Sequence, residues 1–574
     1  MLEKKINPFV SFMQQYDLTT ADYSKIFDEH TTEVQYNIET NVNNEIINIY
    51  KKSPRSIIIT GNAGDGKTRI CRNVFEELSS KQFEQWPKDG IEEIKLDGFR
   101  IRIIKDLSEL RDDVILEELL NLQNALNDGS KKIYYLIAAN EGKLTHFLLK
   151  NQILSSLRDE VIPQFSKNEK LNSKLEIFNL LHSSSSIYAK KIVDEWNKKD
   201  NWSICDSCAA KSFCVINSNY QALSSKTTAV RLNRIYRSLD GNQGHMTMRE
   251  LLIHLAYTYT GSLHCLNIHN ATPSELQEQS RKPYYENFFG HNLPNEVFEE
   301  ISGIQEMRAF DPGHISDSAI DDFILNGDLE SNDLSQMHKT LFGYNIDMEY
   351  GYFYQELREY RLNYRSDEDA GKKLASKWLP RLRRKYYFEF SEKDSIEKLV
   401  PYRYRKLFLD ILKSAKNLDL EIKKELVDGL NVYFSKKMVY SPSNALYVTS
   451  ENLFIYEVIN FSEVKFEIPL DNPNVDQKNS YFLLKIHNKE LKINLLTFEY
   501  LIRLANGGLF NVLKEDVEIL LNNFRNQLIT NKNSKNSILR ILKFDSSIGA
   551  FVLKEIQIQE TVNESEKNNE EDFD

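Results

Sequence analysis

Residues 57–70 read Ile57-Ile58-Ile59-Thr60-Gly61-Asn62-Ala63-Gly64-Asp65-Gly66-Lys67-Thr68-Arg69-Ile70, an apolar run followed by a glycine-rich stretch. The apolar run predicts a short buried strand. After the glycines, apolar residues recur at helical spacing at Ile70, Val74, Phe75 and Leu78. The segment therefore predicts a strand, a tight loop and a helix in direct succession.

The glycine-rich stretch satisfies the pattern Gly-x4-Gly-Lys-Thr in full. In that pattern the glycines let backbone N–H groups turn toward phosphate, the lysine reaches the β- and γ-phosphates, and the threonine binds Mg²⁺. The following helix directs its positive end at the phosphates. The alternative is an ordinary glycine-rich turn. We expect ATP with Mg²⁺, and hydrolysis of the β–γ bond, at a site formed by Gly61, Asn62, Ala63, Gly64, Asp65, Gly66, Lys67 and Thr68. No base-reading motif separates ATP from GTP.

Two further strands are predicted downstream. Residues 99–104 form a partly alternating apolar run that ends at Asp106, and residues 133–139 form a continuous apolar run that ends at Asn140. A helix with apolar residues at helical spacing lies between them, at 115–126. Strands that alternate with helices are typical of a doubly wound α/β fold. We therefore predict an α/β chain whose P-loop NTPase domain contains a parallel sheet.

Hydrolysis also needs a carboxylate near the metal ion and a group that orients the attacking water. Asp106 is the expected metal-side carboxylate, because it follows an apolar strand, and it would hold Mg²⁺ together with Thr68. Glu109 and Glu141 are candidates to orient water. Asn140 ends the third strand, where its side chain could reach the γ-phosphate; in AAA+ ATPases that position is named sensor 1. Each of these residues could instead cap a helix or turn.

The last catalytic candidate is Arg249. Thr247 and Glu250 fit a capping box, which places Arg249 in the first turn of a helix. An arginine there could stabilise phosphate charge as a sensor 2 or finger residue. A surface salt bridge is the alternative.

Three cysteines lie close together in the pattern Cys205-x2-Cys208-x5-Cys214. A Cys-x-x-Cys turn can present two thiolates to one tetrahedral ion, so the cluster is a candidate structural zinc site. A closed site needs a fourth ligand, which would come from Cys265, His264, His245 or His182. Free thiols packed between helices are the main alternative, and an iron–sulfur cluster is a less favoured one.

The composition is that of a multi-domain globular protein. The chain has 574 residues, a formal net charge of −11 and five cysteines, too few for a disulfide scaffold. No apolar stretch is long enough to span a membrane, and the first residues lack an apolar signal segment. We therefore expect a cytoplasmic protein with no membrane partner. The net charge argues against a basic surface that covers the whole chain and wraps DNA.

One segment is nevertheless locally basic. From Arg358 to Lys406 there are 15 Lys and Arg against 8 Asp and Glu. Its runs Arg381–Tyr387 and Tyr402–Lys406 mix guanidinium groups with aromatic rings, a mixture that can grip phosphate and stack on bases. The more common explanation, which we favour for this segment alone, is a charged helix face that pairs with neighbouring acids.

These features suggest five parts. They are an N-terminal helical segment (1–53), a P-loop ATPase domain with a cysteine-containing helical insertion (54–265), a helical domain with the basic segment (266–440), a small α+β domain (441–559), and a disordered acidic tail (560–574). Short strands are expected in the fourth part at 445–448, 464–468 and 481–486, with helices at 496–505 and 517–528.

Several of these pieces occur in an order that resembles a known family. The order is the glycine-rich loop, Asn140-Glu141-Gly142-Lys143-Leu144, the cysteine cluster with Asn217, and Thr247-Met248-Arg249-Glu250-Leu251-Leu252. Phe310-Asp311-Pro312-Gly313 and Val427-Asp428-Gly429-Leu430-Asn431 follow. The sequence, over about residues 35–435, resembles the DptF-type ATPases of bacterial DNA phosphorothioation-dependent restriction. More broadly it resembles AAA+ and STAND-like ATPases of phage-defence loci.

The resemblance implies a motor or switch subunit that works with other proteins of a restriction complex on foreign DNA. No nuclease signature is evident in the chain, so a separate subunit would cut the DNA. Self-association is plausible, because such ATPases form rings. Two other hypotheses stay open: a STAND-like switch whose nucleotide controls oligomerisation, and a kinase that uses the same loop.

Overall fold

The computed structural model describes most of the chain, which divides into two compact units. Unit 1 comprises Met1–Pro401 and the returning segment Asp471–Lys478, and unit 2 comprises Tyr402–Leu470 and Asn479–Asp574. The described residues are 4–17, 38–128, 132–167, 174–299, 301–363, 368–391, 393–413, 420–435, 445–447, 453–458, 462–508, 515–530, 537–545 and 547–558.

A five-stranded sheet organises the first part of unit 1, in the order β2-β3-β4-β1-β5. Strand β1 (Ser56–Thr60) pairs in parallel with β4 (Ile133–Ala139) on one side and β5 (Leu175–Asn179) on the other. Strand β3 (Phe99–Ile104) is parallel to β4, and β2 (Ile91–Leu96) is antiparallel to β3. The carboxyl ends of four parallel strands therefore meet at one edge, where ligands of open α/β sheets bind.

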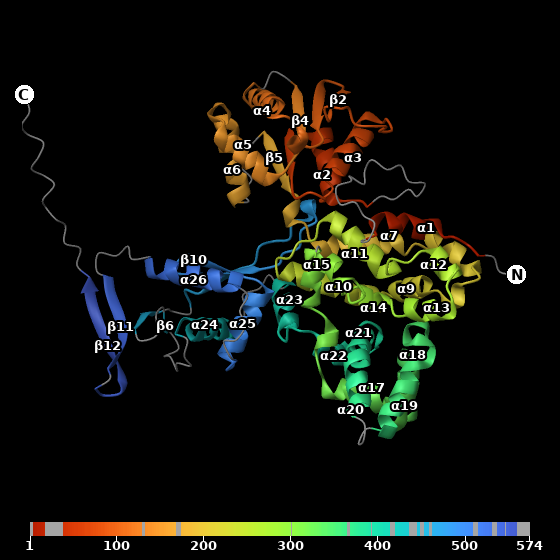
Figure 1. Ribbon diagram of the computed structural model, residues 1–574. Helices are drawn as coiled ribbons and strands as arrows, with labels where there is room; N and C mark the ends of the chain where they lie inside the picture. The colour runs from red at the N-terminus through yellow and green to blue at the C-terminus, as the bar shows by residue number, and fades with distance from the viewer. Residues whose placement is uncertain are drawn as a thin grey trace, which may run out of the picture. The chain divides into compact units, whose positions relative to one another are not determined.

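Helices cover both faces of this sheet (Figure 1). Alternate residues of β1 explain why: Ile57 and Ile59 pack against α2 and α3, while Ile58 packs with α4, α5 and α6 on the other face. All three isoleucines are fully buried, so this strand needs an apolar partner on each side. The helices are α2 (Asn41–Lys52), α3 (Lys67–Ser79), α4 (Asp112–Asn127), α5 (Glu141–Lys150) and α6 (Ser155–Lys167).

The sequence predicted the three strands β1, β3 and β4 and the helices after the first two, and the structure confirms them. It did not predict β5, which lies inside a region expected to be mainly helical, or the antiparallel β2. Strand β5 is only five residues long, with two of them buried. So short a segment carries little periodic signal, and its pairing with β1 decides its conformation.

The rest of unit 1 is helical, as expected for residues 266 onward. An N-terminal helix, α1 (Pro8–Met13), also belongs to it. The helices after β5 are α7 (Ser185–Trp196), α8 (Lys199–Trp202), α9 (Val215–Leu223), α10 (Lys226–Gly241), α11 (Met248–Thr260), α12 (Cys265–His269), α13 (Pro273–Gln279), α14 (Tyr284–Asn287), α15 (Asn295–Glu299), α16 (Ser302–Arg308), α17 (Ser318–Glu330), α18 (Asn332–Phe342), α19 (Tyr352–Asn363), α20 (Glu368–Lys373), α21 (Leu379–Glu389) and α22 (Lys393–Ile396).

The returning segment of unit 1 is held by one buried carboxylate. Asp476 is 1% exposed, and its side chain accepts a hydrogen bond from the backbone N–H of Asn41 at 2.7 Å. It also pairs with the Nζ of Lys191 at 3.0 Å. The segment therefore joins α2 at the sheet to α7 in the helical part.

Unit 2 is α+β. Its helices are α23 (Arg405–Lys413), α24 (Leu420–Ser435), α25 (Leu495–Ala505) and α26 (Glu515–Thr530). One antiparallel sheet has the order β10-β9-β8, and another has the order β12-β11-β7-β6. The strands are β6 (Ala445–Tyr447), β7 (Leu453–Val458), β8 (Lys465–Glu467), β9 (Phe482–Ile486), β10 (Lys489–Ile493), β11 (Ser537–Asp545) and β12 (Ala550–Ile558).

The three strands and two helices predicted for this region are present, and β7, β10, β11 and β12 are additional. The units separate at Pro401 and Tyr402, whereas the sequence suggested boundaries at 265/266 and 440/441. The acidic tail, 560–574, lies outside the described residues. Across the described ranges, no helix combines the length and the apolar character that crossing a bilayer requires.

A glycine in unit 2 gives a direct test of helix packing. A Cβ on Gly429 in α24 would overlap the backbone oxygen of Leu501 in α25. Gly429→Ala should therefore lower the free energy of unfolding of unit 2, by about 1–3 kcal/mol. Gly371→Ala is the matched control, because its Cβ would meet only Tyr360, at 3.9 Å. The control should be neutral or stabilising by up to about 1 kcal/mol. Urea unfolding measures the free energy of unfolding of both variants. Equal losses of stability would contradict the close packing of α24 against α25.

Candidate functional site

The loop between β1 and α3 has a backbone that requires its glycines. Gly61, Gly64 and Gly66 have φ angles of +155°, +94° and +84°, a region that other residues rarely adopt. A Cβ on Gly61 would come within 2.7 Å of the Asp65 carboxylate, and one on Gly64 within 3.1 Å of the Cβ of Arg249. Gly66 is the N-cap of α3 and has open space at its Cα. The loop is therefore closely packed at Gly61 and Gly64, whereas Gly66 has space beside it for a ligand.

The carboxylate of Asp65 holds the loop in this shape. Its Oδ2 accepts a hydrogen bond from the backbone N–H of Asn62 at 2.5 Å, and its Oδ1 lies 3.0 Å from Nε2 of His245. The other ring nitrogen of His245 lies 3.3 Å from the backbone oxygen of Ser183. His245 belongs to the segment before α11, so Asp65 connects the loop to the helical part of unit 1.

The pair of Asp65 and His245 favours a charged imidazole. Burial alone would lower the pKa of His245, but the hydrogen bond and the negative charge of Asp65 raise it above its ordinary 6.5. The carboxylate of Asp65 is itself 2% exposed, so its charge is poorly screened by water. The connection is therefore ionic as well as hydrogen-bonded when His245 is protonated.

Lys67 points its ammonium back over the loop. Its Nζ donates to the backbone oxygens of Gly61 at 2.9 Å and Asn62 at 2.7 Å. Burial lowers the pKa of Lys67, and the charges of Asp65 and Asp106 offset that effect only in part. The ammonium is therefore buried against backbone oxygens of the loop, near the carboxylates of Asp65 and Asp106.

Thr68 and Asp106 both lie at the carboxyl edge of the sheet. Thr68 is half-buried in the first turn of α3. Asp106 follows β3, and its charge acts on Lys67. Its Oδ1 also accepts from the backbone N–H of Ser108 at 2.7 Å, so it caps a short 3-10 turn as well. Glu109 points elsewhere, since it is 43% exposed and pairs with Lys105 at 3.0 Å.

Asn140 and Glu141 lie beside the loop. Strand pairing sets Thr60, the last residue of β1, between Ala139 of β4 and Asn179 of β5. Asn140 caps α5 by accepting from the backbone N–H of Lys143 at 3.1 Å. Glu141 accepts from Nδ2 of Asn179 at 2.9 Å. Because β1 separates β4 from β5, the Glu141–Asn179 hydrogen bond crosses the end of the strand that leads into the loop.

Arg249 reaches the loop from the helical part. Thr247 and Glu250 form the predicted capping box, with the Thr247 N–H donating to Glu250 at 2.8 Å. The backbone N–H of Arg249, in the first turn of α11, donates to the backbone oxygen of Gly64 at 3.0 Å. The sequence correctly placed Arg249 near a helix start, and the structure places that start against the loop.

The basic run Arg381–Tyr387 does not form a nucleic-acid surface. Arg381, Arg384 and Lys385 in α21 are 4–5% exposed. Arg384 donates to Asp311 from Nε at 2.8 Å and to Glu286 from a terminal nitrogen at 2.7 Å. The charged helix face paired with acids, the explanation favoured from the sequence, is therefore confirmed for this run, which cannot contact DNA while it is buried.

The family-like motif around Asp311 also has a structural role. His291, Asp311 and His314 place their ligand atoms within 4.8 Å of one another, as metal ligands do. Burial alone would raise the pKa of Asp311, but hydrogen bonds from His291, His314 and Arg384 hold it well below its ordinary value. Arg384 contacts both carboxylate oxygens, at 2.8 and 2.9 Å. A metal ion at this group would therefore have to share the Asp311 carboxylate with the guanidinium of Arg384.

The cysteines that the sequence singled out gather in the helical part of unit 1. Cys205 and Cys208 lie next to Cys214 and Cys265, whose charges would act on one another. Burial raises the pKa of Cys214 to about 12. His245 is bound to Asp65 and is not part of this group. His269, which the sequence reasoning did not consider, lies 3.7 Å from the sulfur of Cys208.

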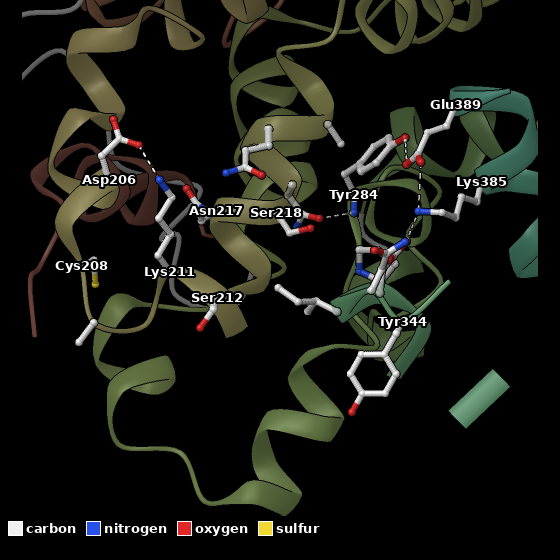
Figure 2. Close-up of a pocket in the computed structure, with 18 residues that line it drawn as sticks. Asp206, Cys208, Lys211, Ser212, Asn217, Ser218, Tyr284, Tyr344, Lys385 and Glu389 are labelled. Carbon is white, nitrogen blue, oxygen red and sulfur yellow. Dashed lines mark hydrogen bonds and ion pairs between the residues drawn. The ribbon is translucent and has the colours of Figure 1, made fainter. Parts of the chain in front are cut away.

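A cavity of about 810 Å³ lies beside these cysteines (Figure 2). Its charged side chains are already paired: Asp206 with Lys211 at 2.9 Å, and Glu389 with Lys385 at 3.1 Å. Tyr284 donates to Glu389 at 2.9 Å. The lining residues are Asp206, Cys208, Ala209, Lys211, Ser212, Asn217, Ser218, Asn219, Gln221, Ala222, Pro283, Tyr284, Tyr344, Asn345, Ile346, Asp347, Lys385 and Glu389. None of the residues of the glycine-rich loop lines this cavity.

The sequence did not predict that two further residues would contact the loop or its neighbouring carboxylates. His245 was considered only as a zinc ligand, and Asn179 not at all. Asn179 ends an apolar strand as Asn140 does, so the same rule would have found it had β5 been recognised. His245 carries no such signal, because only the folded chain brings it to Asp65.

Comparison with known proteins gives no relative. A scan against protein-family models, a search of curated proteins and a search of solved structures each found no match to this chain.

The His245–Asp65 pair predicts a pH-dependent stability. Because folding raises the pKa of His245, its contribution is complete below about pH 6.5 and is lost as the pH rises through the folded-state pKa. His245→Gln should therefore destabilise the protein on the order of 1 kcal/mol at pH 6 and by less at pH 8. Urea unfolding at several pH values measures this difference. His146→Gln, at an exposed position of α5, is the control. A destabilisation that does not change with pH would contradict the ionic pair.

Proposed function

We propose that this chain binds ATP with Mg²⁺ on the loop Gly61–Thr68 and hydrolyses it as a P-loop ATPase. The observation that carries the proposal is the arrangement around Lys67. Its ammonium is buried against the backbone oxygens of Gly61 and Asn62, and Lys67 is the first residue of α3. An anionic phosphate at this position would pair with the ammonium and accept hydrogen bonds from the N–H groups at the start of the helix.

The residues present suit a magnesium ion beside that phosphate. Thr68 would offer its hydroxyl and Asp106 a carboxylate that already acts on Lys67. A bound Mg²⁺ would supply positive charge to neutralise the negative charge that develops during hydrolysis. Asp106 must then release its hydrogen bond to the N–H of Ser108 or share an oxygen.

Glu141 is the better candidate to orient water. It lies at the end of β1, held by Asn179, whereas Glu109 pairs with Lys105 away from the site. Asn140, one residue earlier, would contact the γ-phosphate. The backbone N–H of Arg249 donates to the backbone oxygen of Gly64. A rotation of the Arg249 side chain would therefore bring its guanidinium to a phosphate bound on the loop.

At the level of the cell, we propose an ATPase subunit of a bacterial DNA restriction or anti-phage complex in the cytoplasm. The support is the order of motifs that resembles the DptF-type ATPases. Since the run Arg381–Tyr387 is buried, it offers no DNA contact. Any DNA that the complex handles would meet other surfaces of this chain, partner proteins or further copies of the chain.

A nucleotide-dependent switch is the second candidate. What favours it is that the loop is tied to the helical part of unit 1 at two points, through Asp65 with His245 and through Gly64 with Arg249. A bound triphosphate that moves the loop would move both. A motor that works on DNA should hydrolyse ATP several-fold faster when DNA and partner proteins are added. A turnover rate that does not respond to either would favour the switch.

Substitution of Lys67 tests the proposed activity. Lys67→Ala should lower ATP turnover by at least about 100-fold, because the transition-state charge loses its main cationic contact. The protein should stay folded, since the hydrogen bonds of Lys67 go to two backbone oxygens of its own loop and join no other element. Lys51→Ala is the matched control, because Lys51 is 53% exposed and pairs with Glu77 on the protein surface. Phosphate release measures both variants. Unchanged turnover in Lys67→Ala would refute the site.

A further inference from the structure

Four of the five cysteines of the chain converge from three separate segments. Cys205 and Cys208 lie on one turn, in which the N–H of Cys208 donates to the backbone oxygen of Cys205 at 3.2 Å. Cys214 is the N-cap of α9, and Cys265 is the first residue of α12. Three of the four sulfur atoms lie against one N-terminal segment: those of Cys205 and Cys265 against Asn7, and that of Cys208 at 3.8 Å from the backbone oxygen of Lys5.

Hydrogen-bond donors point at the sulfur atoms of this group. Asn7, which is 1% exposed, donates its backbone N–H to the Sγ of Cys265 at 3.4 Å and its Nδ2 to the Sγ of Cys205 at 3.3 Å. The backbone N–H groups of Ile216 and Asn217 donate to Cys214. Hydrogen-bonding groups of this kind around the ligand atoms orient the ligands of a metal site.

We propose that Cys205, Cys208, Cys214 and Cys265 together bind one structural Zn²⁺ ion. Four thiolates form a closed tetrahedral zinc site, and such a site has no open position for catalysis. Among the described residues a second group, His291, Asp311 and His314, also brings its ligand atoms within 4.8 Å of one another, but Arg384 donates to both carboxylate oxygens of its Asp311. This inference does not depend on the proposed ATPase activity.

Binding requires a small convergence of the side chains. Zn–S bonds of about 2.3 Å place sulfur atoms about 3.8 Å apart. Among the described residues, no three of these sulfur atoms all lie within 4.8 Å of one another. Binding would therefore need the cysteine side chains, which lie in a turn or at helix starts, to adopt other χ1 rotamers. His269, which lies 3.7 Å from the Sγ of Cys208 and 2.9 Å from the backbone oxygen of Lys5, stays outside as a hydrogen-bonding neighbour.

The ion would anchor the N-terminal segment. Asn7 caps α1, and Phe9 in α1 packs edge-on against Trp196 and Trp202 at 6.0 and 5.8 Å between ring centroids. A zinc ion at the four sulfurs would fix Asn7 and the start of α12 to the turn of Cys205. Loss of the ion would therefore loosen α1 while leaving the sheet and its loop in place.

The experiment measures metal in the full-length protein purified under reducing conditions. We expect one zinc per chain by elemental analysis, and release of that zinc when a mercurial reagent titrates the thiols of the wild-type protein. Replacement by Co²⁺ should give the intense thiolate-to-cobalt absorption of a four-sulfur site. Each of the single variants Cys205→Ser, Cys208→Ser, Cys214→Ser and Cys265→Ser should lower the zinc content at least tenfold.

The fifth cysteine provides the control. Cys71 is buried in α3 beside the sheet, so Cys71→Ser should keep one zinc per chain, as should His269→Ala. The proposal is overturned if reduced wild-type protein neither contains zinc nor takes up Zn²⁺ or Co²⁺. It is equally overturned if His269→Ala loses the metal while one of the four cysteine variants keeps it. The wild-type titration gives an answer even where a cysteine variant does not fold.

Discussion

The hydrogen bonds of Asp65 are the constraint on which the candidate site depends. One carboxylate oxygen holds the N–H of Asn62 and so closes the loop on itself, and the other holds His245 of the helical part. The short approach of Asp65 to Gly61 explains why that position excludes a side chain. Since the carboxylate is almost fully buried, these contacts act without competition from water. The geometry of the phosphate-binding candidate is thus fixed by a residue that would not itself touch phosphate.

The helical part of unit 1 supports this site through buried charge. Arg381, Arg384 and Lys385 lie inside a network of acids and do not face solvent. Removing one member of such a network leaves an uncompensated charge, which is strongly destabilising. The network therefore specifies how α21 packs against its neighbours. Helix α11 belongs to the same unit, and the N–H of Arg249 in its first turn donates to the backbone oxygen of Gly64.

The sequence predicted structure that depends on local patterns, and it did not predict contacts between distant segments. The residues of β1, β3, β4 and α3 carry strong local periodicity, and the Thr247–Glu250 capping box is a local pattern, so each was predicted correctly. The partners His245 and Asn179 could not be predicted, because their roles arise from contacts between distant segments. The run Arg381–Tyr387 was ambiguous for the same reason: composition shows charge, but only the fold shows that acids surround it.

The central claim is that the loop from Gly61 to Thr68 holds a triphosphate, and amide hydrogen–deuterium exchange tests it at the residues concerned. The exchange is compared with and without a non-hydrolysable ATP analogue and Mg²⁺. The account predicts slower exchange in peptides that cover residues 61–70, because phosphate oxygens accept those N–H groups, with little change in β7 of unit 2. Unchanged exchange over residues 61–70 at saturating nucleotide would contradict it.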